Sequence, residues 1–180
     1  MRISQSFKGD VKAYYGLEHD PNMWFFLKRL ILEVGLQFVF LTRIQLHLVS
    51  RNRFRMARLI HLLNLKSTGG EVSFTATIGP AFVVKHPNGV LIGEQVTLGK
   101  NCTLLKGVTF GLRDVRDLSG QPQTTSVGDS CVIGTHAVIL SGVDLGDHCN
   151  VGANSVVTKS FPSNTTVVGI PARAIDESRP

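Results

Sequence analysis

The side chains in this sequence that could do chemistry near neutral pH are six histidines and three cysteines. A neutral imidazole accepts a proton in this range, so each histidine is a candidate general base or metal ligand. His86 lies beside a turn proline in the segment KHPNG. The other histidines lie at corner positions of a repeat or in the N-terminal region: His19, His47, His61, His136 and His148. A position beside a turn proline also suits an ordinary surface histidine.

The three cysteines are Cys102, Cys131 and Cys149. Each stands at the same position of a six-residue repeat, where small side chains recur, so we expect buried, reduced thiols. Their spacing does not resemble a zinc site. The odd number of cysteines and the lack of a signal-peptide pattern favour a reducing cytoplasm.

An aliphatic residue returns every six positions between residues 72 and 170, often followed by glycine. This period fits neither an amphipathic helix nor a simple alternating strand, and it is one of the repeat periods of a parallel β-helix. Three repeats make one triangular coil of 18 residues, with one irregular step between Val90 and Ile92. The positions are Val72, Ile78, Val84, Val90, Ile92, Leu98, Leu104, Phe110, Val127, Ile133, Ile139, Leu145, Val151 and Val157.

The chain divides into a helical region, residues 1–70, a β-helix, residues 71–175, and a polar tail, residues 176–180. An excursion loop at residues 111–126 interrupts the repeats, and long loops in regular folds are often functional. Helical spacing predicts one helix within Met23 to Val49 and a second from about Arg53 to Leu65. The turn signal KSTGG leads into the β-helix.

The net charge of +6 is concentrated in the helical region, where Glu33 is the only acidic residue between Asn22 and Gly70. Such asymmetry favours an anionic neighbour, which could be lipid, nucleic acid or an acidic glycan. The helices are too apolar to stand alone, so we expect them to pack on another subunit or to contact a membrane surface. Charged residues interrupt the apolar stretch, which argues against a membrane span.

Beyond these patterns, the hexapeptide array and the segment VVGIPAR resemble the left-handed β-helix acyltransferases. KHPNGVLIGE at residues 85–94 is similar to the segment that carries the catalytic histidine in serine acetyltransferases, and KGVTFG also resembles that branch. The likeness covers roughly residues 71–175, and the short helical region resembles compact sugar and polysaccharide O-acetyltransferases. It implies a left-handed parallel β-helix, a homotrimer, and acetyl-CoA as co-substrate with no metal.

The resemblance assigns two catalytic residues. His86 would be the general base that takes the proton of an acceptor hydroxyl and returns one to the leaving thiolate of CoA. Glu71 aligns with the acidic residue that orients this histidine in the family. A trimeric β-helix can also bind zinc through three histidines, as γ-class carbonic anhydrases do, but this chain lacks their paired histidine spacing.

The same resemblance implies that acetyl-CoA lies in a groove between two subunits, held largely by backbone groups. The matching positions are Gly111, Thr135 and Ala153, and Lys159 and Arg173 are candidate contacts for the phosphates of CoA.

The acceptor is where this chain departs from the serine acetyltransferase pattern. Lys85 replaces the acidic residue before the catalytic histidine, and Gln123 and Thr124 replace an Arg-His pair that grips the serine carboxylate. A buried substrate charge needs a partner. We therefore expect a sugar or surface-polysaccharide hydroxyl as the acceptor, with Lys85, Arg113 and Arg116 as contacts for an anionic glycan.

Two other functions stay open. The first is a true serine O-acetyltransferase of cysteine synthesis, and the second is a non-catalytic β-helix that serves as an assembly or membrane-binding module. In the leading interpretation the protein is cytoplasmic, without a nucleic-acid partner, and its basic helices hold it at the inner face of the membrane.

Overall fold

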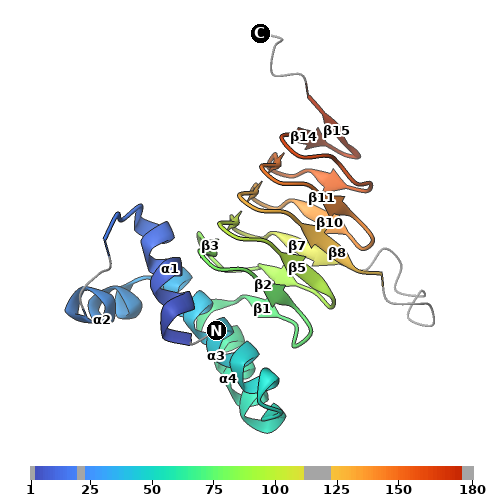
Figure 1. Ribbon diagram of the computed structural model, residues 1–180. Helices are drawn as coiled ribbons and strands as arrows, with labels where there is room; N and C mark the ends of the chain where they lie inside the picture. The colour runs from blue at the N-terminus through green and yellow to red at the C-terminus, as the bar shows by residue number, and fades with distance from the viewer. Residues whose placement is uncertain (1–2, 20–22, 112–122, 176–180) are drawn as a thin grey trace.

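The computed structural model describes residues 3–19, 23–111 and 123–175, so Arg113 and Arg116 lie outside the described residues. Within these ranges the helices are α1 Ile3–Tyr15, α2 Met23–Leu32, α3 Val34–Ser50 and α4 Phe54–Thr68. They gather at one end of a triangular prism of short strands, and β14 and β15 lie at the other end (Figure 1). None of the described helices is both long and apolar enough to cross a membrane.

The expected helix within Met23 to Val49 is in fact two helices. The break falls at Glu33, whose backbone is extended (φ −109°, ψ 105°). Just after the break, α3 lies close against the prism: a Cβ added at Gly35 would overlap the carbonyl oxygen of Val84. Glycine is the residue that permits such a backbone approach.

Short parallel strands form the three faces of the prism. In the described part of the chain the first sheet has the order β1-β4-β7-β10-β13, the second β2-β5-β8-β11, and the third β3-β6-β9-β12-β14-β15. Among the strands of the described residues, only β14 and β15 pair antiparallel. The architecture is the expected left-handed parallel β-helix. The strands are β1 Glu71–Val72, β2 Thr77–Ile78, β3 Val83–Val84, β4 Leu91–Ile92, β5 Val96–Leu98, β6 Thr103–Leu104, β7 Thr109–Gly111, β8 Thr125–Val127, β9 Val132–Ile133, β10 Val138–Leu140, β11 Asp144–Leu145, β12 Asn150–Val151, β13 Val156–Val157, β14 Thr166–Gly169 and β15 Ala172–Ala174.

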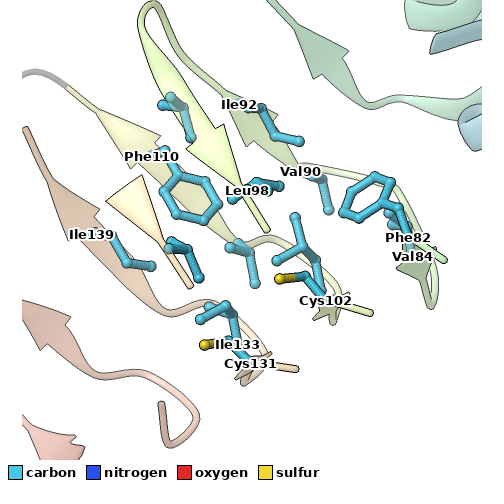
Figure 2. Close-up of a cluster of buried hydrophobic side chains, with 14 of the residues drawn as sticks. Phe82, Val84, Val90, Ile92, Leu98, Cys102, Phe110, Cys131, Ile133 and Ile139 are labelled. Carbon is cyan, nitrogen blue, oxygen red and sulfur yellow. The ribbon is translucent and has the colours of Figure 1, made fainter. Parts of the chain in front are cut away.

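The apolar interior follows the repeat. Ile92 pairs in register with Phe110, and Phe110 with Ile139, so each side chain stacks on its counterpart in the next coil. Figure 2 shows these side chains and those of Leu98 and Ile133 meeting inside the coils. Since each coil buries its interior only against its neighbours, the two ends of the stack need separate covers.

The irregular step near Val90 is a widened corner. Leu91 pairs with Thr109 and Val84 with Leu104. The corner from Val84 to Val90 is therefore two residues longer than the one from Leu104 to Val108. Val90 thus belongs with the small inward positions, and the prediction that it begins a repeat is wrong. The two additional residues lie in the segment that contains His86.

Polar side chains of the helices close the first coil. Arg43 of α3 is buried and donates to the carbonyl oxygens of Ile78 (2.7 Å) and Gly79 (2.6 Å). The same guanidinium donates to both carboxylate oxygens of Asp10 on α1, each at 2.9 Å. Asp10 also accepts the amide N–H of Phe82 at 2.8 Å, and Gln45 donates to the carbonyl oxygen of Val72 at 2.8 Å. The helices thus bind backbone groups of the first coil, which has no preceding coil to bind them.

We expect Asp10→Ala to lower the free energy of unfolding by roughly 3–5 kcal/mol, because it leaves the Arg43 guanidinium buried without its counter-charge. Urea denaturation measures this. Arg29→Gln is the matched control, since Arg29 lies on the surface 3.6 Å from Glu33, and such pairs contribute about 0–1 kcal/mol. Equal losses in the two variants would contradict a structural role for the buried pair.

The three thiols should be unreactive in the folded protein. Cys102, Cys131 and Cys149 have 0% exposed surface. Burial raises the pKa of Cys149, and a hydrogen bond to Cys102 together with burial raises the pKa of Cys131, whereas the same hydrogen bond lowers the pKa of Cys102. With Ellman's reagent at pH 8 we expect no native reaction and three thiols in denaturant. Lys100→Cys, at an exposed corner, is the positive control, and rapid native labelling of the unaltered chain would contradict the buried arrangement.

Candidate functional site

His86 lies on the outside of the widened corner. The chain leaves β3 at Val84 and turns at His86, whose φ is 60°, in the left-handed region. The amide of Val90 then donates to the carbonyl oxygen of Pro87 (2.9 Å) around Gly89, which has φ 76°. The imidazole is exposed, and the structure records no hydrogen bond to it from the described residues. It is therefore accessible to a ligand from the solvent.

The corners between the third and first sheets form one edge of the prism, which we call the His86 edge: residues 85–89, 105–107, 134–136 and 152–154. Lys85 donates its amide to Leu104, Leu105 to Ile133 and Gly134 to Val151, which sets the register of successive corners. Lys106, Thr135 and Ala153 therefore follow His86 along this edge, one coil apart. Neighbouring coils are about 4.8 Å apart, as in any β-sheet.

This edge presents a row of backbone donors. In the described part of the chain, the amide groups of Lys106, Thr135 and Ala153 donate to no protein acceptor. The carbonyl groups of Lys106 and Thr135 are used, since the amide of His136 donates to Lys106 (2.8 Å) and that of Asn154 to Thr135 (2.8 Å). Unpaired amides at a surface are satisfied by water or by a ligand. The edge can thus bind a molecule that carries carbonyl groups at regular intervals.

The edge between the second and third sheets shows that this openness is not general. There the equivalent amides are capped by the next coil, because Lys100 donates to Asp129 Oδ1 (2.7 Å) and Asp129 to Asp147 Oδ1 (2.7 Å). Asp147 in turn donates its amide to the Ser163 hydroxyl at 2.9 Å. The His86 edge has lysine, threonine and alanine at these positions, and none of them supplies a cap.

Lys85 is held by the helical region. Its ammonium donates to the carbonyl oxygen of Tyr14 at 3.1 Å and lies 3.6 Å from the centroid of the Tyr14 ring. Burial raises the pKa of the Tyr14 phenol, which keeps it neutral. The lysine charge is thus balanced by the C-terminal end of α1 and a π face. Its predicted contact with an acceptor stays a prediction.

Glu71 has a partner other than His86. Its Oε1 lies 3.8 Å from Nε2 of His61 on α4, and the His61 ring lies 5.3 Å from the ring of Phe74. The backbone of Glu71 does adjoin the widened corner, because its amide donates to Val90 (2.8 Å). The structure brings Glu71 to the neighbourhood of His86, and its role in orienting the imidazole stays a prediction.

The predicted cofactor residues fall into separate groups. Thr135 and Ala153 lie on the His86 edge. Gly111 ends β7, and Lys159 follows β13 with its ammonium 5.5 Å from the Phe161 ring, so both lie at the edge between the first and second sheets. Arg173 is exposed on β15, at the far end of the third sheet. Within one chain these groups do not converge on a single point.

Sequence reasoning missed Lys106 and the row of free amides. Lys106 could have been found from its position one coil after His86. The widened corner lengthens that coil by two residues, so a count of three six-residue repeats from His86 does not reach Lys106. His136 is exposed at its corner, as we expected, and its ring lies over Gly107, where an added Cβ would overlap Nδ1. Among the described residues, no three His, Cys, Asp or Glu side chains are grouped so as to hold a metal ion.

Comparisons with known proteins agree with the fold. Residues 124–159 match the family model described as bacterial transferase hexapeptide (six repeats). The serine acetyltransferase of Staphylococcus epidermidis is 35% identical over 170 residues, which cover 94% of this chain and 78% of that protein. The serine acetyltransferase of Bacillus pumilus is 33% identical over 168 residues, or 93% and 75% of the two chains.

Solved structures of serine acetyltransferases are also similar to this fold. Neisseria gonorrhoeae serine acetyltransferase superposes with a TM-score of 0.85 at 30% identity, over 99% of this chain and 68% of that one. A second structure of that enzyme, in complex with serine, gives 0.83 at 28% identity, over 97% and 69%. Brucella abortus serine acetyltransferase in complex with coenzyme A gives 0.84 at 26% identity, over 97% and 68%.

Proposed function

Since this chain belongs to the serine acetyltransferase family of hexapeptide-repeat transferases and is an acyltransferase, we propose that it transfers an acetyl group from acetyl-CoA to the hydroxyl of L-serine at the His86 edge. The observation that supports the site is the position of His86 at the head of the free amide row. Serine leads because it is the substrate in the names of relatives that align over 94% of the chain. This reverses our preference from the acceptor residues alone, which was for a sugar hydroxyl.

The chemistry needs one base at the acceptor oxygen. Acetyl-CoA supplies the thioester carbonyl carbon. The neutral His86 imidazole accepts the hydroxyl proton as the oxygen forms its bond to that carbon, and it gives a proton to the sulfur as the carbon–sulfur bond breaks. Transfer is direct, so the chain needs no nucleophile of its own, and all three cysteines are buried away from this edge.

The His86 edge suits the pantetheine arm of acetyl-CoA. That arm carries amide carbonyl groups, which can accept from the free amides of Lys106, Thr135 and Ala153. Lys159 and Arg173 are exposed cations that could pair with phosphate groups by charge-assisted hydrogen bonds. Because these residues lie on other parts of the prism, one bound molecule that meets both sets would lie between two subunits. We propose a homotrimer for this reason.

A second candidate acceptor is a sugar or surface-polysaccharide hydroxyl. Two observations favour it. Lys85 stands where an acidic residue would bind the serine ammonium. The Lys85 ammonium already donates to the carbonyl oxygen of Tyr14. Gln123 lies over Gly142, where an added Cβ would be 2.7 Å from its Oε1, and it cannot form an ion pair with a carboxylate. In this case Arg113 and Arg116 would be contacts for an anionic glycan.

An acceptor panel distinguishes these candidates. We expect purified protein to release CoA thiol from acetyl-CoA with L-serine, and His86→Ala to lower kcat by roughly 10²–10⁴-fold because the base is lost. Sugars and glycans occupy the other wells. Release of CoA thiol with a glycan and not with serine would identify a sugar hydroxyl as the acceptor. Full activity of His86→Ala would contradict the assignment of His86 as the base.

A pair of variants tests Glu71. If its carboxylate orients His86, Glu71→Gln should lower kcat while the KM for acetyl-CoA and the urea midpoint stay unchanged. His61→Gln is the control, because it removes the 3.8 Å contact with Glu71 and leaves the corner intact. If the two variants lose activity equally, Glu71 acts through α4 and does not orient the histidine.

A further inference from the structure

Helices α2 and α4 expose an apolar surface away from the prism. On α2 it consists of Trp24, Leu27 and Ile31, of which Trp24 is 77% and Ile31 74% exposed. On α4 it consists of Met56, Leu59, Leu62 and Leu63, with Leu59 67% exposed. We call these seven side chains the α2/α4 face. Isolated exposed leucines are common, but a set this large marks an interaction site.

The arrangement of α4 explains the exposure. Its buried residues are Ala57, Asn64 and Thr68, which recur at helical spacing and face α3. Asn64 donates to the Thr42 hydroxyl (3.1 Å) and to the carbonyl oxygen of Phe38 (3.3 Å). The inner side of α4 is therefore small and polar, and its leucines point outward. The apolar side of this amphipathic helix therefore faces away from the core of its own chain and toward an outside partner.

The apolar surfaces of α2 and α4 join through a groove. A cavity of about 300 Å³ between α2, α3 and α4 is lined by Leu30, Ile31, Phe40, Leu41 and Leu63, with Gln37 and Ser67. Ile31 and Leu63 belong both to the groove and to the α2/α4 face. The groove thus joins the exposed apolar side chains of α2 to those of α4.

Unpaired cations surround this surface. In the described part of the chain Lys28, Arg51, Arg53, Arg55, Arg58 and Lys66 form no ion pair, while Glu33 contacts Arg29. All six are exposed. Arg55 and Lys66 stand on the same side of α4 as Leu59 and Leu62, because helical positions three, four and seven apart share a side. The apolar side chains are therefore interspersed with positive charge.

We propose that the α2/α4 face binds the surface of an anionic phospholipid membrane, with α2 and α4 lying in the plane of the headgroups. A tryptophan and leucines that enter the acyl boundary, with arginine and lysine at the level of the phosphates, are the features of an interfacial helix. A second copy of the chain fits less well, since two copies of this face would bring two sets of positive charges together with no acidic residues among them to balance the charge. Lipid phosphates supply the opposite charge that a second copy lacks.

Docking in this way has a consequence for the site. The helices cover the first coil, and that coil carries His86. Lys85 beside it already contacts α1. A membrane at the α2/α4 face would therefore lie at the same end of the prism as the base, whichever acceptor it serves. Binding to lipid does not depend on the proposed reaction and is measured without it.

Trp24 gives a direct measurement, since it is the only tryptophan in the chain. The full-length protein is mixed with vesicles of phosphatidylcholine alone or with one third phosphatidylglycerol. We expect its emission to shift to the blue and the protein to sediment with the anionic vesicles only, and both effects to weaken as salt is added. No shift and no sedimentation with anionic vesicles would overturn the proposal.

Substitutions test whether the α2/α4 face is the surface that binds lipid. Leu59→Ser should weaken vesicle binding roughly tenfold, from the apolar area that no longer enters the bilayer. Arg55→Gln and Lys66→Gln should each weaken it about fivefold. Ile170→Ser, at an equally exposed isoleucine on the distal end of the prism (73%), and Lys100→Gln are the controls and should bind normally. Unchanged binding by all three test variants would overturn the proposal. So would a blue shift without lipid that grows with protein concentration, which would show a second copy on this face.

Discussion

The buried Arg43 guanidinium is the contact on which the arrangement of this molecule depends. A β-helix extends by adding coils, so its first coil has carbonyl groups that no preceding coil can bind. Arg43 takes two of these carbonyls, at Ile78 and Gly79, and Asp10 balances its charge while accepting the amide of Phe82. The contact joins α1, α3 and the first coil in one buried network. The position of His86 relative to the helices follows from it.

Above that coil, the parallel ladder keeps successive corners in register, and the side chains at those corners decide which amides are capped. Asp129, Asp147 and Ser163 cap the amides along one edge, whereas Lys106, Thr135 and Ala153 leave theirs free along the His86 edge. Capped amides have no hydrogen left to donate, whereas free surface amides can donate to water or to a ligand. The free amides of Lys106, Thr135 and Ala153 lie on the edge that carries the histidine, which is the arrangement expected of a binding groove.

The helical region shows why its composition was difficult to interpret. Its apolar residues serve two different surfaces: Leu36, Phe38 and Val39 of α3 are buried against the first coil, whereas the leucines of α4 face outward. Periodicity alone indicated amphipathic helices but not which side would be covered, because the covered side of α4 is made of Ala57, Asn64 and Thr68. Which residues of α4 lie against α3 depends on how the two helices pack, and the hydropathy of the sequence does not identify them.

The sequence by itself determined the coil, its apolar columns and the burial of the cysteines, because each follows from a repeat of six. It placed the irregular step after Val90, whereas the pairing of successive coils places the two additional residues before Val90. The hand of the coil does not follow from the period, which fits either hand. Only the tertiary structure decided that Lys85 contacts Tyr14, that Glu71 contacts His61, and which amides stay unpaired. Those outcomes join residues from different elements or successive coils. They depend on how helices and coils pack in three dimensions, and a spacing rule along the chain carries no information about that.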